Sequence, residues 1–375
     1  MSVVEPCGPL DAEIVILGEA PGAEEVSDGK PFTDAAGRML FDQILTAGNI
    51  RRDKCRVLYT HWSAPPGVRW DTITNLGTFD HMTMGSITAK PRKAIIAVGE
   101  HALNFCLHGT AKVPKAKQES AYKWRGSILM DTVAFPGTPV IPMIHPRSVL
   151  RSSGYKEDDG TDSSERGSLH FKALCQLDAR RVRQVVDDPD FRPPARRVYH
   201  PQNSSWDELA NILANIDRSG PLAFDIETFA HTITCVGVSW TENEALVVPF
   251  TEVPEWTLGQ RTDLIMELAE ILADGNPKIG QNLDYDVQHL AQIGIGVSNV
   301  WLDTAVAHSI LYPEIPHDLA MLTSIYTLQP YFKEMRKEVE TDQYDEAQWT
   351  YNGLDCCVTY EIGMKLAAEL KEKSQ

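Results

Sequence analysis

Two carboxylates stand one residue apart at the end of an apolar run, in the stretch Pro-Leu-Ala-Phe-Asp-Ile-Glu-Thr at residues 221–228. Because side chains i and i+2 of a β-strand point to the same face, we expect Asp225 and Glu227 to lie side by side. Two such acids repel each other, and burying them is costly unless a cation lies between them. Oxygen ligands favour Mg²⁺ or Mn²⁺, so the pair predicts a divalent metal site. Taken alone, the pair also fits the solvated end of a strand.

Two later stretches supply further acids. The first, Ile-Gly-Gln-Asn-Leu-Asp-Tyr-Asp, contains Asn282, which fits a helix cap that puts Asp286 in the first helical turns. The second, Tyr-Asn-Gly-Leu-Asp, lies in a predicted helix that extends to about residue 371. Tyr351 and Asp355 are spaced i and i+4 and therefore share one helical face. Three separate segments thus offer carboxylates to one site.

The order Asp-x-Glu, Asn-x-x-x-Asp, Tyr-x-x-x-Asp resembles the proofreading 3′–5′ exonuclease domains of the DnaQ-like, DEDD-tyrosine type. The stretch is most similar to the exonuclease domains of DNA polymerase I-like enzymes. Leu302-Asp303-Thr304 and His317-Asp318-Leu319 stand where that family has its Asp-Thr and His-Asp-Leu signatures. The resemblance covers roughly residues 196–375 and implies an RNase H-like domain with a mixed sheet.

This resemblance implies a two-metal exodeoxyribonuclease site, with Mg²⁺ or Mn²⁺ ions about 4 Å apart. The implied ligands are Asp225, Glu227, Asp286 and Asp355. Tyr351 would orient the attacking water or help to deprotonate it, and Asn282 would lie at the substrate. Asp284 is an alternative ligand, but Asp286 has the family spacing from Asn282 and precedes the apolar positions of its helix. The product would be a nucleoside monophosphate, released from a single-stranded or frayed 3′ end.

The first part of the chain alternates predicted strands with predicted helices. Residues 12–18 form an apolar strand that leads into a Gly/Pro-rich loop and then a helix to about residue 47. Further strands are predicted at residues 56–60, 94–99 and 140–144. This alternation predicts a mostly parallel sheet, and a loop after a strand is the usual ligand-binding position in such a sheet. The loop is not a P-loop, because no Gly-Lys-Ser/Thr follows.

Four motifs in this part resemble the uracil-DNA glycosylase superfamily, with family 4 as the nearest branch. They are Gly-Glu-Ala-Pro-Gly, Gly-x-Pro-Phe, Ala-Gly-Arg and Ile-His-Pro-x-x-x-Leu-Arg, within residues 10–187. The resemblance implies a three-layer α/β/α domain. It also implies that Gly18 and Glu19 belong to the loop that positions the attacking water, that Phe32 stacks on the flipped-out base, and that His145 stabilises the uracil anion.

The sequence departs from family 4 at two places. Family-4 enzymes usually hold an iron–sulfur cluster on four cysteines, but Cys7 is the only early cysteine here, so we expect no cluster. His61 occupies the position of an Asn that reads uracil. An Asn amide pairs with both O4 and N3–H, whereas a neutral imidazole offers one donor and one acceptor in a different shape. Changed base specificity and weak activity are both open.

We expect two domains joined by a short linker. Residues 1–187 form the glycosylase-like domain, with a mobile loop at 152–168 that lacks apolar periodicity. Residues 188–195 are polar and Pro-rich and form the linker, and residues 196–375 form the exonuclease domain. A chain of 375 residues is long enough for each domain to bury its own core.

The composition and charge indicate the compartment in which we expect the protein and the partners that its charge opposes. The apolar runs are too short to span a membrane, and the N-terminus lacks a signal-peptide pattern, so we expect a cytoplasmic protein of a bacterial cell or a phage-infected host. The net charge of −17 opposes binding to DNA phosphates. Clustered carboxylates, however, count as negative only until metal binds.

The leading hypothesis is a bifunctional DNA repair and replication enzyme, with base excision in the first domain and 3′–5′ exonuclease activity in the second. Its partners would be single-stranded 3′ ends and uracil-containing DNA, with no membrane. An alternative makes the first domain a non-catalytic base- or DNA-recognition module. A further alternative is an accessory protein that binds a separately encoded DNA polymerase and supports its proofreading.

Overall fold

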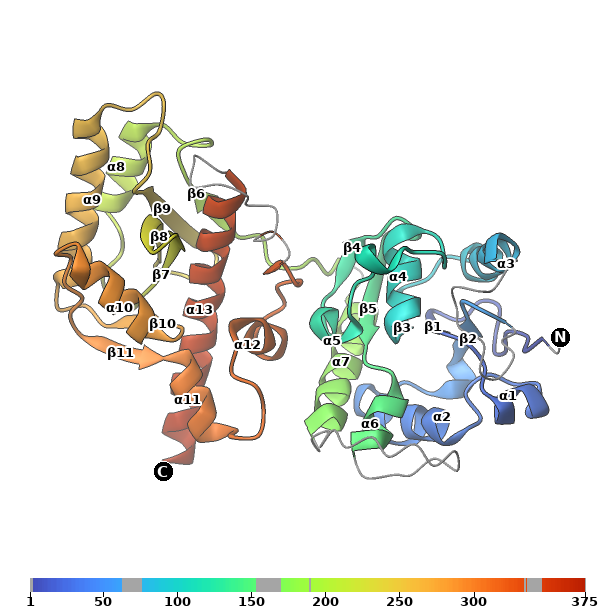
Figure 1. Ribbon diagram of the computed structural model, residues 1–375. Coiled ribbons are helices and arrows are strands. Elements are labelled where there is room, and N and C mark those ends of the chain that lie inside the picture. Colours follow the sequence, from blue (N-terminus) through green and yellow to red (C-terminus); the bar gives the residue numbers. More distant parts are fainter. Residues whose placement is uncertain are drawn as a thin grey trace. The chain divides into compact units, whose positions relative to one another are not determined.

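In a computed structural model, the chain divides into two compact units, residues 1–193 and 194–375 (Figure 1). The structure describes residues 3–62, 76–152, 170–188, 190–333, 335 and 346–374. Apart from its first residue, the predicted mobile loop at 152–168 lies outside the described residues.

The first unit is built on a five-stranded sheet in the order β2-β1-β3-β5-β4. The strands are β1 (Ile14–Gly18), β2 (Cys55–Tyr59), β3 (Ala94–Val98), β4 (Leu129–Asp131) and β5 (Pro136–Met143). Strand β1 pairs in parallel with β2 and β3, and β3 pairs in parallel with β5, whereas β4 runs antiparallel to β5. Every residue of β1 and β3 is buried, as expected for parallel strands covered on both faces. The predicted mostly parallel sheet is confirmed.

Seven α-helices are described in the first unit. They are α1 (Ala23–Asp28), α2 (Ala35–Met39), α3 (Leu76–Thr88), α4 (Glu100–His108), α5 (Ala121–Trp124), α6 (Pro146–Ser152) and α7 (His170–Asp187). Helix α2 continues as a π-helical turn and a 3₁₀ turn to Gly48, which together account for the helix predicted to about residue 47. The side chains of Arg125 and Asp178 form an ion pair that is fully buried and joins the end of α5 to α7.

The second unit is built on a six-stranded sheet in the order β11-β10-β7-β8-β9-β6. The strands are β6 (Arg197–Tyr199), β7 (Leu222–Phe229), β8 (Thr232–Ser239), β9 (Glu244–Pro249), β10 (Lys278–Gly280) and β11 (Val300–Asp303). Strands β7, β8 and β9 pair in antiparallel fashion, whereas β10 pairs in parallel with β7 and β11, and β6 in parallel with β9. The predicted mixed sheet is confirmed.

Helices pack against both faces of the second sheet. They are α8 (Trp206–Ala214), α9 (Leu258–Ala273), α10 (Leu283–Gln292), α11 (Thr304–Leu311), α12 (Leu319–Tyr326) and α13 (Glu346–Lys373). Leu222, Phe224 and Ile226 of β7 join the core formed with α8, α9 and α10. Ala223, one residue out of step, joins the core formed with α11, α12 and the long helix α13 (Figure 1). The alternation of β7 therefore turns its odd-numbered residues toward α13.

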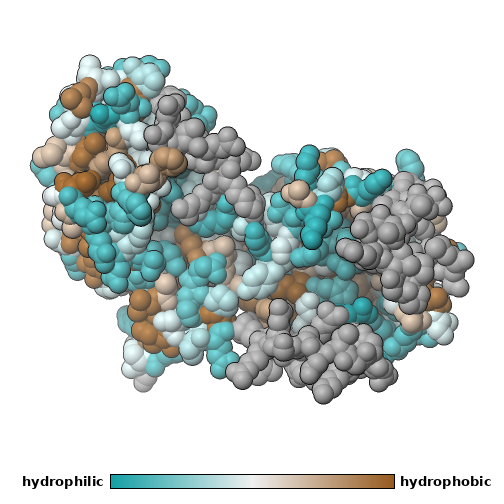
Figure 2. Space-filling view, viewed as in Figure 1, coloured by the Kyte–Doolittle hydropathy of each residue, from teal (hydrophilic) through white to brown (hydrophobic). Residues whose placement is uncertain are grey.

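On the face shown in Figure 2, the described residues are mainly hydrophilic, with hydrophobic residues in smaller areas between them. Among the described residues, no helix combines the length and the apolar character needed to cross a membrane.

Candidate catalytic sites

Three carboxylates meet between strand β7 and helix α13. Asp225 and Glu227 share the odd-numbered face of β7, and Asp355 approaches from α13. One carboxylate oxygen from each residue lies within 4.8 Å of the others. Among the described residues, this is the one group of three or more His, Cys, Asp or Glu side chains close enough to hold a metal ion together. We call these three residues the carboxylate cluster.

Asn352 fastens α13 to β7 beside this cluster. Its Nδ2 donates to the Oδ2 of Asp225 at 2.8 Å and to the Asp225 carbonyl oxygen at 3.1 Å. Gly237 of β8 lies opposite Asp225 in the sheet, and a Cβ there would lie 2.5 Å from the Oδ1 of Asn352. The glycine therefore leaves room for the amide. Sequence reasoning missed Asn352, although it directly follows Tyr351.

Asp286 approaches β7 from helix α10. Its Oδ1 accepts a hydrogen bond at 2.9 Å from the backbone N–H of Ile226, the residue between Asp225 and Glu227. Asp286 is buried, and this burial is the main cause that raises its pKa to about 7. Asp284, the alternative, is exposed to solvent. Asp286 thus lies next to the carboxylate cluster without being one of the three residues that form it.

Asn282 stands at the N-terminus of α10, as predicted, but its side chain makes no capping hydrogen bond. Its φ of 58° puts it in the left-handed region, which Asn tolerates better than most residues. The capping acceptor is Asp303, whose carboxylate accepts the backbone N–H of Asn282 at 3.2 Å and that of Leu283 at 2.8 Å. Asn282 is therefore the N-cap residue of α10, as predicted, but Asp303, 21 positions away, accepts the N–H groups at the start of the helix.

Burial and the closeness of several carboxylates shift the pKa values of groups in this site. The pKa of Asp225 is raised well above its usual value, first by burial and then by the charges of Asp286, Asp355 and Glu227. Burial also raises the pKa of the Tyr351 hydroxyl, so that Tyr351 keeps its proton. The ammonium of Lys333, which sequence reasoning missed, offsets part of the negative charge at Asp225.

This donor set suits a divalent ion. Mg²⁺ and Mn²⁺ prefer carboxylate oxygens, and the carboxylate cluster offers three of them at close range. Burial, followed by the charges of the neighbouring acids, raises the pKa of Asp225, and a bound cation would offset those charges. The residues present therefore fit the metal ions that the exonuclease resemblance implies.

The residues predicted for base excision gather at the carboxyl ends of the first sheet's strands. The carbonyl oxygen of Gly18 accepts the N–H of Thr60 at 2.9 Å, and that of Glu19 accepts the N–H of His61 at 3.0 Å. One carboxylate oxygen of Glu19 accepts the backbone N–H of His101 at 3.1 Å, in the first turn of α4. The loop after β1 is thus fixed to the loop after β2 and to the start of α4.

The imidazole of His61 is buried and neutral. The hydroxyl of Thr60 donates to the Glu19 carbonyl oxygen at 2.7 Å, so it accepts from the Nδ1–H of His61, which lies 2.9 Å away. The proton therefore sits on Nδ1, and Nε2 is an acceptor. Burial, followed by the nearby His101, lowers the pKa of His61 to about 4, which keeps the ring neutral at neutral pH.

His145 follows β5 and carries the opposite tautomer. Its Nδ1 accepts the backbone N–H of Arg147 at 3.2 Å, which leaves the proton of the neutral ring on Nε2. The guanidinium of Arg147 lies 3.2 Å from Asp34, the N-cap residue of α2, and so ties the His-Pro segment to the loop that follows α1. His145 is half-buried.

The side chain of Phe32 is buried, and neighbouring side chains hold its backbone by hydrogen bonds. Glu25 accepts the backbone N–H of Phe32 at 2.5 Å, and the guanidinium of Arg52 donates to its carbonyl oxygen at 2.7 Å. These bonds hold Phe32 at a positive φ of 54° with its ring 5.0 Å from that of Tyr59. The ring tip touches Gly18, where a Cβ would lie 2.5 Å from it. Phe32 also lines a cavity of about 410 Å³, whose lining does not include Glu19, His61 or His145.

All seven cysteines are free thiols in the structure. Cys7 is half-buried and pairs through its backbone with Val57 of β2. The other six are buried. The expectation that the chain carries no iron–sulfur cluster stays a prediction.

Comparison with known proteins matches the two units to two different families. The family model described as "Uracil DNA glycosylase superfamily" matches residues 5–163, and the one described as "3'-5' exonuclease" matches residues 202–371. The type-4 uracil-DNA glycosylase of Thermotoga maritima is 34% identical over 145 residues, covering 39% of this chain and 70% of that protein. The type-4 enzyme of Archaeoglobus fulgidus is 26% identical over 164 residues, covering 42% of this chain and 77% of that protein.

The second unit has a different kind of relative. DNA polymerase I of Synechocystis sp. is 31% identical over 180 residues, which cover 44% of this chain. The chain spans only 18% of the length of that polymerase.

Proposed function

Since the chain belongs to the uracil-DNA glycosylase superfamily through residues 5–163 and carries a 3′–5′ exonuclease domain over residues 202–371, we propose that both parts are catalytic. The chain is a DNA repair or processing enzyme. Its substrates are single-stranded or frayed 3′ ends for the second domain and DNA that contains uracil or a related base for the first. The observation that carries the nuclease proposal is the carboxylate cluster, whose oxygens lie within 4.8 Å of one another.

In the exonuclease site, Asp225, Glu227 and Asp355 hold divalent ions together with Asp286. When bound, these ions would activate the attacking water and stabilise the leaving 3′ oxygen. Tyr351 acts as a hydrogen-bond donor that orients the water, because burial raises the pKa of its hydroxyl and keeps it protonated. Asn352 keeps the Asp225 carboxylate in register with α13 through its 2.8 Å bond.

In the glycosylase site, Glu19 positions the attacking water, and the Nε2–H of His145 donates to O2 of the departing uracil anion. Support for the role of His145 comes from the 3.2 Å bond at its Nδ1, which leaves the proton on Nε2. His61 offers an acceptor at Nε2 to the N3–H of uracil and leaves O4 unread. Gly18 lets Phe32 approach the end of β1, and Phe32 stacks on the flipped-out base.

The deciding experiment uses a labelled oligonucleotide with one internal uracil. The Asp225→Ala protein is used so that exonuclease degradation does not mask abasic sites, and the reaction is finished with alkali. We expect cleavage at the uracil, and we expect it to disappear when His145→Ala is added. Absence of cleavage with Asp225→Ala alone would leave the nuclease as the single activity.

A second candidate function follows from His61. The Nδ1–H of His61 is used by Thr60, so Nε2 reads one atom of uracil where an Asn amide reads two, which weakens binding of the base edge. The first domain would then be a non-catalytic recognition module for an exonuclease that proofreads for a separately encoded DNA polymerase. In that case the protein binds uracil-containing DNA without cleaving it, and it co-purifies with the polymerase.

A further inference from the structure

A lysine ammonium lies on the carboxylate cluster. The Nζ of Lys333 is 2.7 Å from Oδ1 and 2.6 Å from Oδ2 of Asp355. It also donates to the hydroxyl oxygen of Tyr351 at 2.7 Å. The side chain of Lys333 is 18% exposed and that of Asp355 is 5% exposed, so this ion pair is largely shielded from water. Both oxygens of one proposed metal ligand are therefore engaged by a cation that belongs to the chain itself.

The neighbouring side chains hold Lys333 in this position. Phe332 is buried in the same core as Tyr351, and the two rings are 5.8 Å apart. Met335, on the other side of Lys333, packs against that core as well. The backbone is therefore anchored on both sides of Lys333, next to the cluster.

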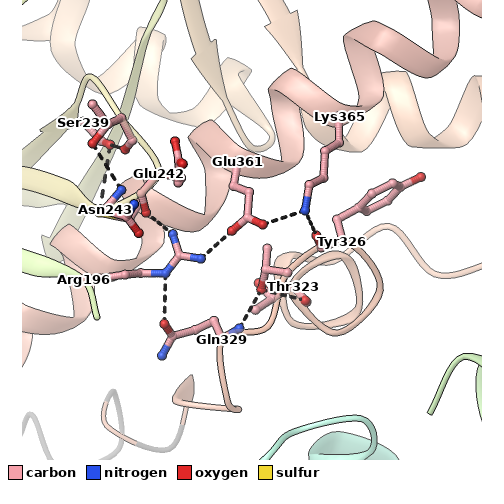
Figure 3. Close-up of polar contacts among 12 residues, drawn as sticks. Arg196, Ser239, Glu242, Asn243, Thr323, Tyr326, Gln329, Glu361 and Lys365 are labelled. Atoms are coloured by element: carbon pink, nitrogen blue, oxygen red, sulfur yellow. Dashed lines mark hydrogen bonds and ion pairs between the residues drawn. The ribbon is translucent and has the colours of Figure 1, made fainter. Parts of the chain in front are cut away.

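A polar network fixes the chain four residues before Lys333. Figure 3 shows Arg196 between Gln329 and Glu361, with bonds of 3.0 and 2.5 Å. Glu361 in turn pairs with Lys365 at 2.6 Å, and Lys365 donates to the Tyr326 carbonyl oxygen at 2.5 Å. The segment that leads from α12 to Lys333 is thus tied to helix α13, which carries Asp355.

An ammonium and a divalent ion compete for these oxygens. A carboxylate ligand places a divalent cation about 2 Å from its oxygen, whereas Lys333 already donates to both oxygens of Asp355. Two cations a few ångströms apart in a shielded site repel each other strongly. Without the ammonium, the same crowding would leave Asp225, Glu227 and Asp355 repelling one another.

We propose that Lys333 is an internal competitor of the metal ion: it neutralises the carboxylate cluster in the metal-free protein and must leave Asp355 when metal binds. This inference rests on the proposed exonuclease function. Lys333 thereby lowers the affinity of the site for metal and keeps Tyr351 and Asp355 together until metal arrives.

The test titrates the 375-residue chain with Mn²⁺ and measures the free ion by electron paramagnetic resonance. Lys333→Met removes the charge and retains an apolar stem, and we expect it to bind Mn²⁺ at least ten-fold more tightly than the unchanged protein. Lys333→Arg keeps a positive charge and should keep the weaker affinity. Equal or weaker affinity of Lys333→Met would overturn the proposal.

Lys93→Met is the matched control, because Lys93 forms an ion pair with Glu13 in the first unit and does not touch the cluster. Its Mn²⁺ affinity should equal that of the unchanged protein. If Lys333→Met does not fold without metal, Lys333→Gln replaces it in the titration, with the same expected gain and the same contrary result.

Thermal unfolding gives an independent readout. In EDTA, Lys333→Met should unfold at a lower temperature than the unchanged protein, because its carboxylates have lost their counter-ion. Saturating Mn²⁺ should stabilise Lys333→Met more than it stabilises the unchanged protein, since tighter binding gives the larger stabilisation. Equal stabilisation of both by Mn²⁺ would contradict the competition.

The Asp225→Ala variant distinguishes a failure of this inference from a failure of the proposed exonuclease function. Loss of Mn²⁺ binding in Asp225→Ala, with equal affinities for Lys333→Met and the unchanged protein, would reject the competition and leave the metal site standing. Unchanged Mn²⁺ binding in Asp225→Ala would instead reject the proposed metal site itself.

Discussion

At the scale of single residues, two aspartates on helix α10 provide a matched pair. Asp286 is buried and bonded to the Ile226 N–H, whereas Asp284, two residues earlier in the same helix, is exposed. If Asp286 serves the metal site, Asp286→Asn should lower the exonuclease kcat by roughly 100-fold, the upper effect typical of groups that support metal ligands. Asp284→Asn should stay within about two-fold, as is usual for a surface change. Release of nucleoside monophosphate from a single-stranded oligonucleotide measures both, and equal losses would remove Asp286 from the site.

The buried imidazole of His61 makes stability depend on pH. Its pKa is lowered to about 4 in the folded protein, against 6.5 for the free group. Between these values the unfolded chain binds the proton and the folded chain does not, so the stability present above pH 6.5 falls as the pH decreases toward 4. At one pKa unit per 1.4 kcal/mol, His61 accounts for about 3 kcal/mol of this loss.

We therefore expect His61→Asn to flatten the pH dependence of the free energy of unfolding in this range. Urea unfolding of the full chain between pH 4 and pH 7 measures the effect. His231→Asn is the control, because His231 is exposed and its left-handed backbone suits Asn. An identical slope in both variants would mean that His61 is accessible to protons in the folded state.

Two pairs of candidate residues could be predicted from local periodicity. Asp225 and Glu227 share a strand face, and Tyr351 and Asp355 share a helical face. The spacing alone therefore predicts that the two members of each pair lie side by side. Lys333 and Asn352 are different, because each reaches the site through contacts made by the tertiary fold. Spacing also does not reveal that Phe32 is enclosed by Glu25, Arg52 and Tyr59.

At the scale of elements, one carboxylate joins the starts of two helices. Asp303 accepts the N–H groups of Asn282 and Leu283 at the start of α10, and it caps α11 through the N–H of Ala305 at 2.8 Å. Each lost cap costs about 1 kcal/mol, and Asp303 serves two helices. Asp303→Ala should therefore destabilise the protein by about 2 kcal/mol.

Asp318 supplies the control for this prediction, because it caps only α12, through the N–H of Met321 at 3.1 Å. Asp318→Ala should cost about 1 kcal/mol. Chemical denaturation compares the two variants. Similar losses would show that Asp303 makes no net contribution to α10, and hence none to the placement of Asp286.

Elements were predictable from sequence where burial is continuous. The apolar runs that became β1 and β7 stand out, since both lie in the interior of a sheet. Strand β10 has three residues, too few for any period, and its place between β7 and β11 comes from parallel pairing across the chain. The left-handed backbone conformation of Asn282 could not be predicted from the sequence either, because it depends on the distant Asp303.

At the scale of the whole molecule, the second unit has a core of its own. The apolar clusters described around its sheet draw their members from residues 198–370. The carboxylate cluster and Asp286 also lie within residues 194–375. The same is true of Asn352, of Lys333 and of the Arg196 network. The fold and the proposed nuclease chemistry of this unit therefore draw on one continuous stretch of chain.

This self-sufficiency predicts that a protein consisting of residues 194–375 folds alone and degrades 3′ ends with Mn²⁺. Cutting before Pro194 removes no member of the described cores of that unit and leaves Arg196, its first anchor, in place. Circular dichroism should show one cooperative unfolding transition, and kcat should lie within about three-fold of the full chain carrying His145→Ala. The same fragment with Asp225→Ala controls for a contaminating nuclease. A fragment that folds but is inactive would mean that the first unit contributes to the nuclease site or to its substrate, because loss of stability would then no longer explain the defect.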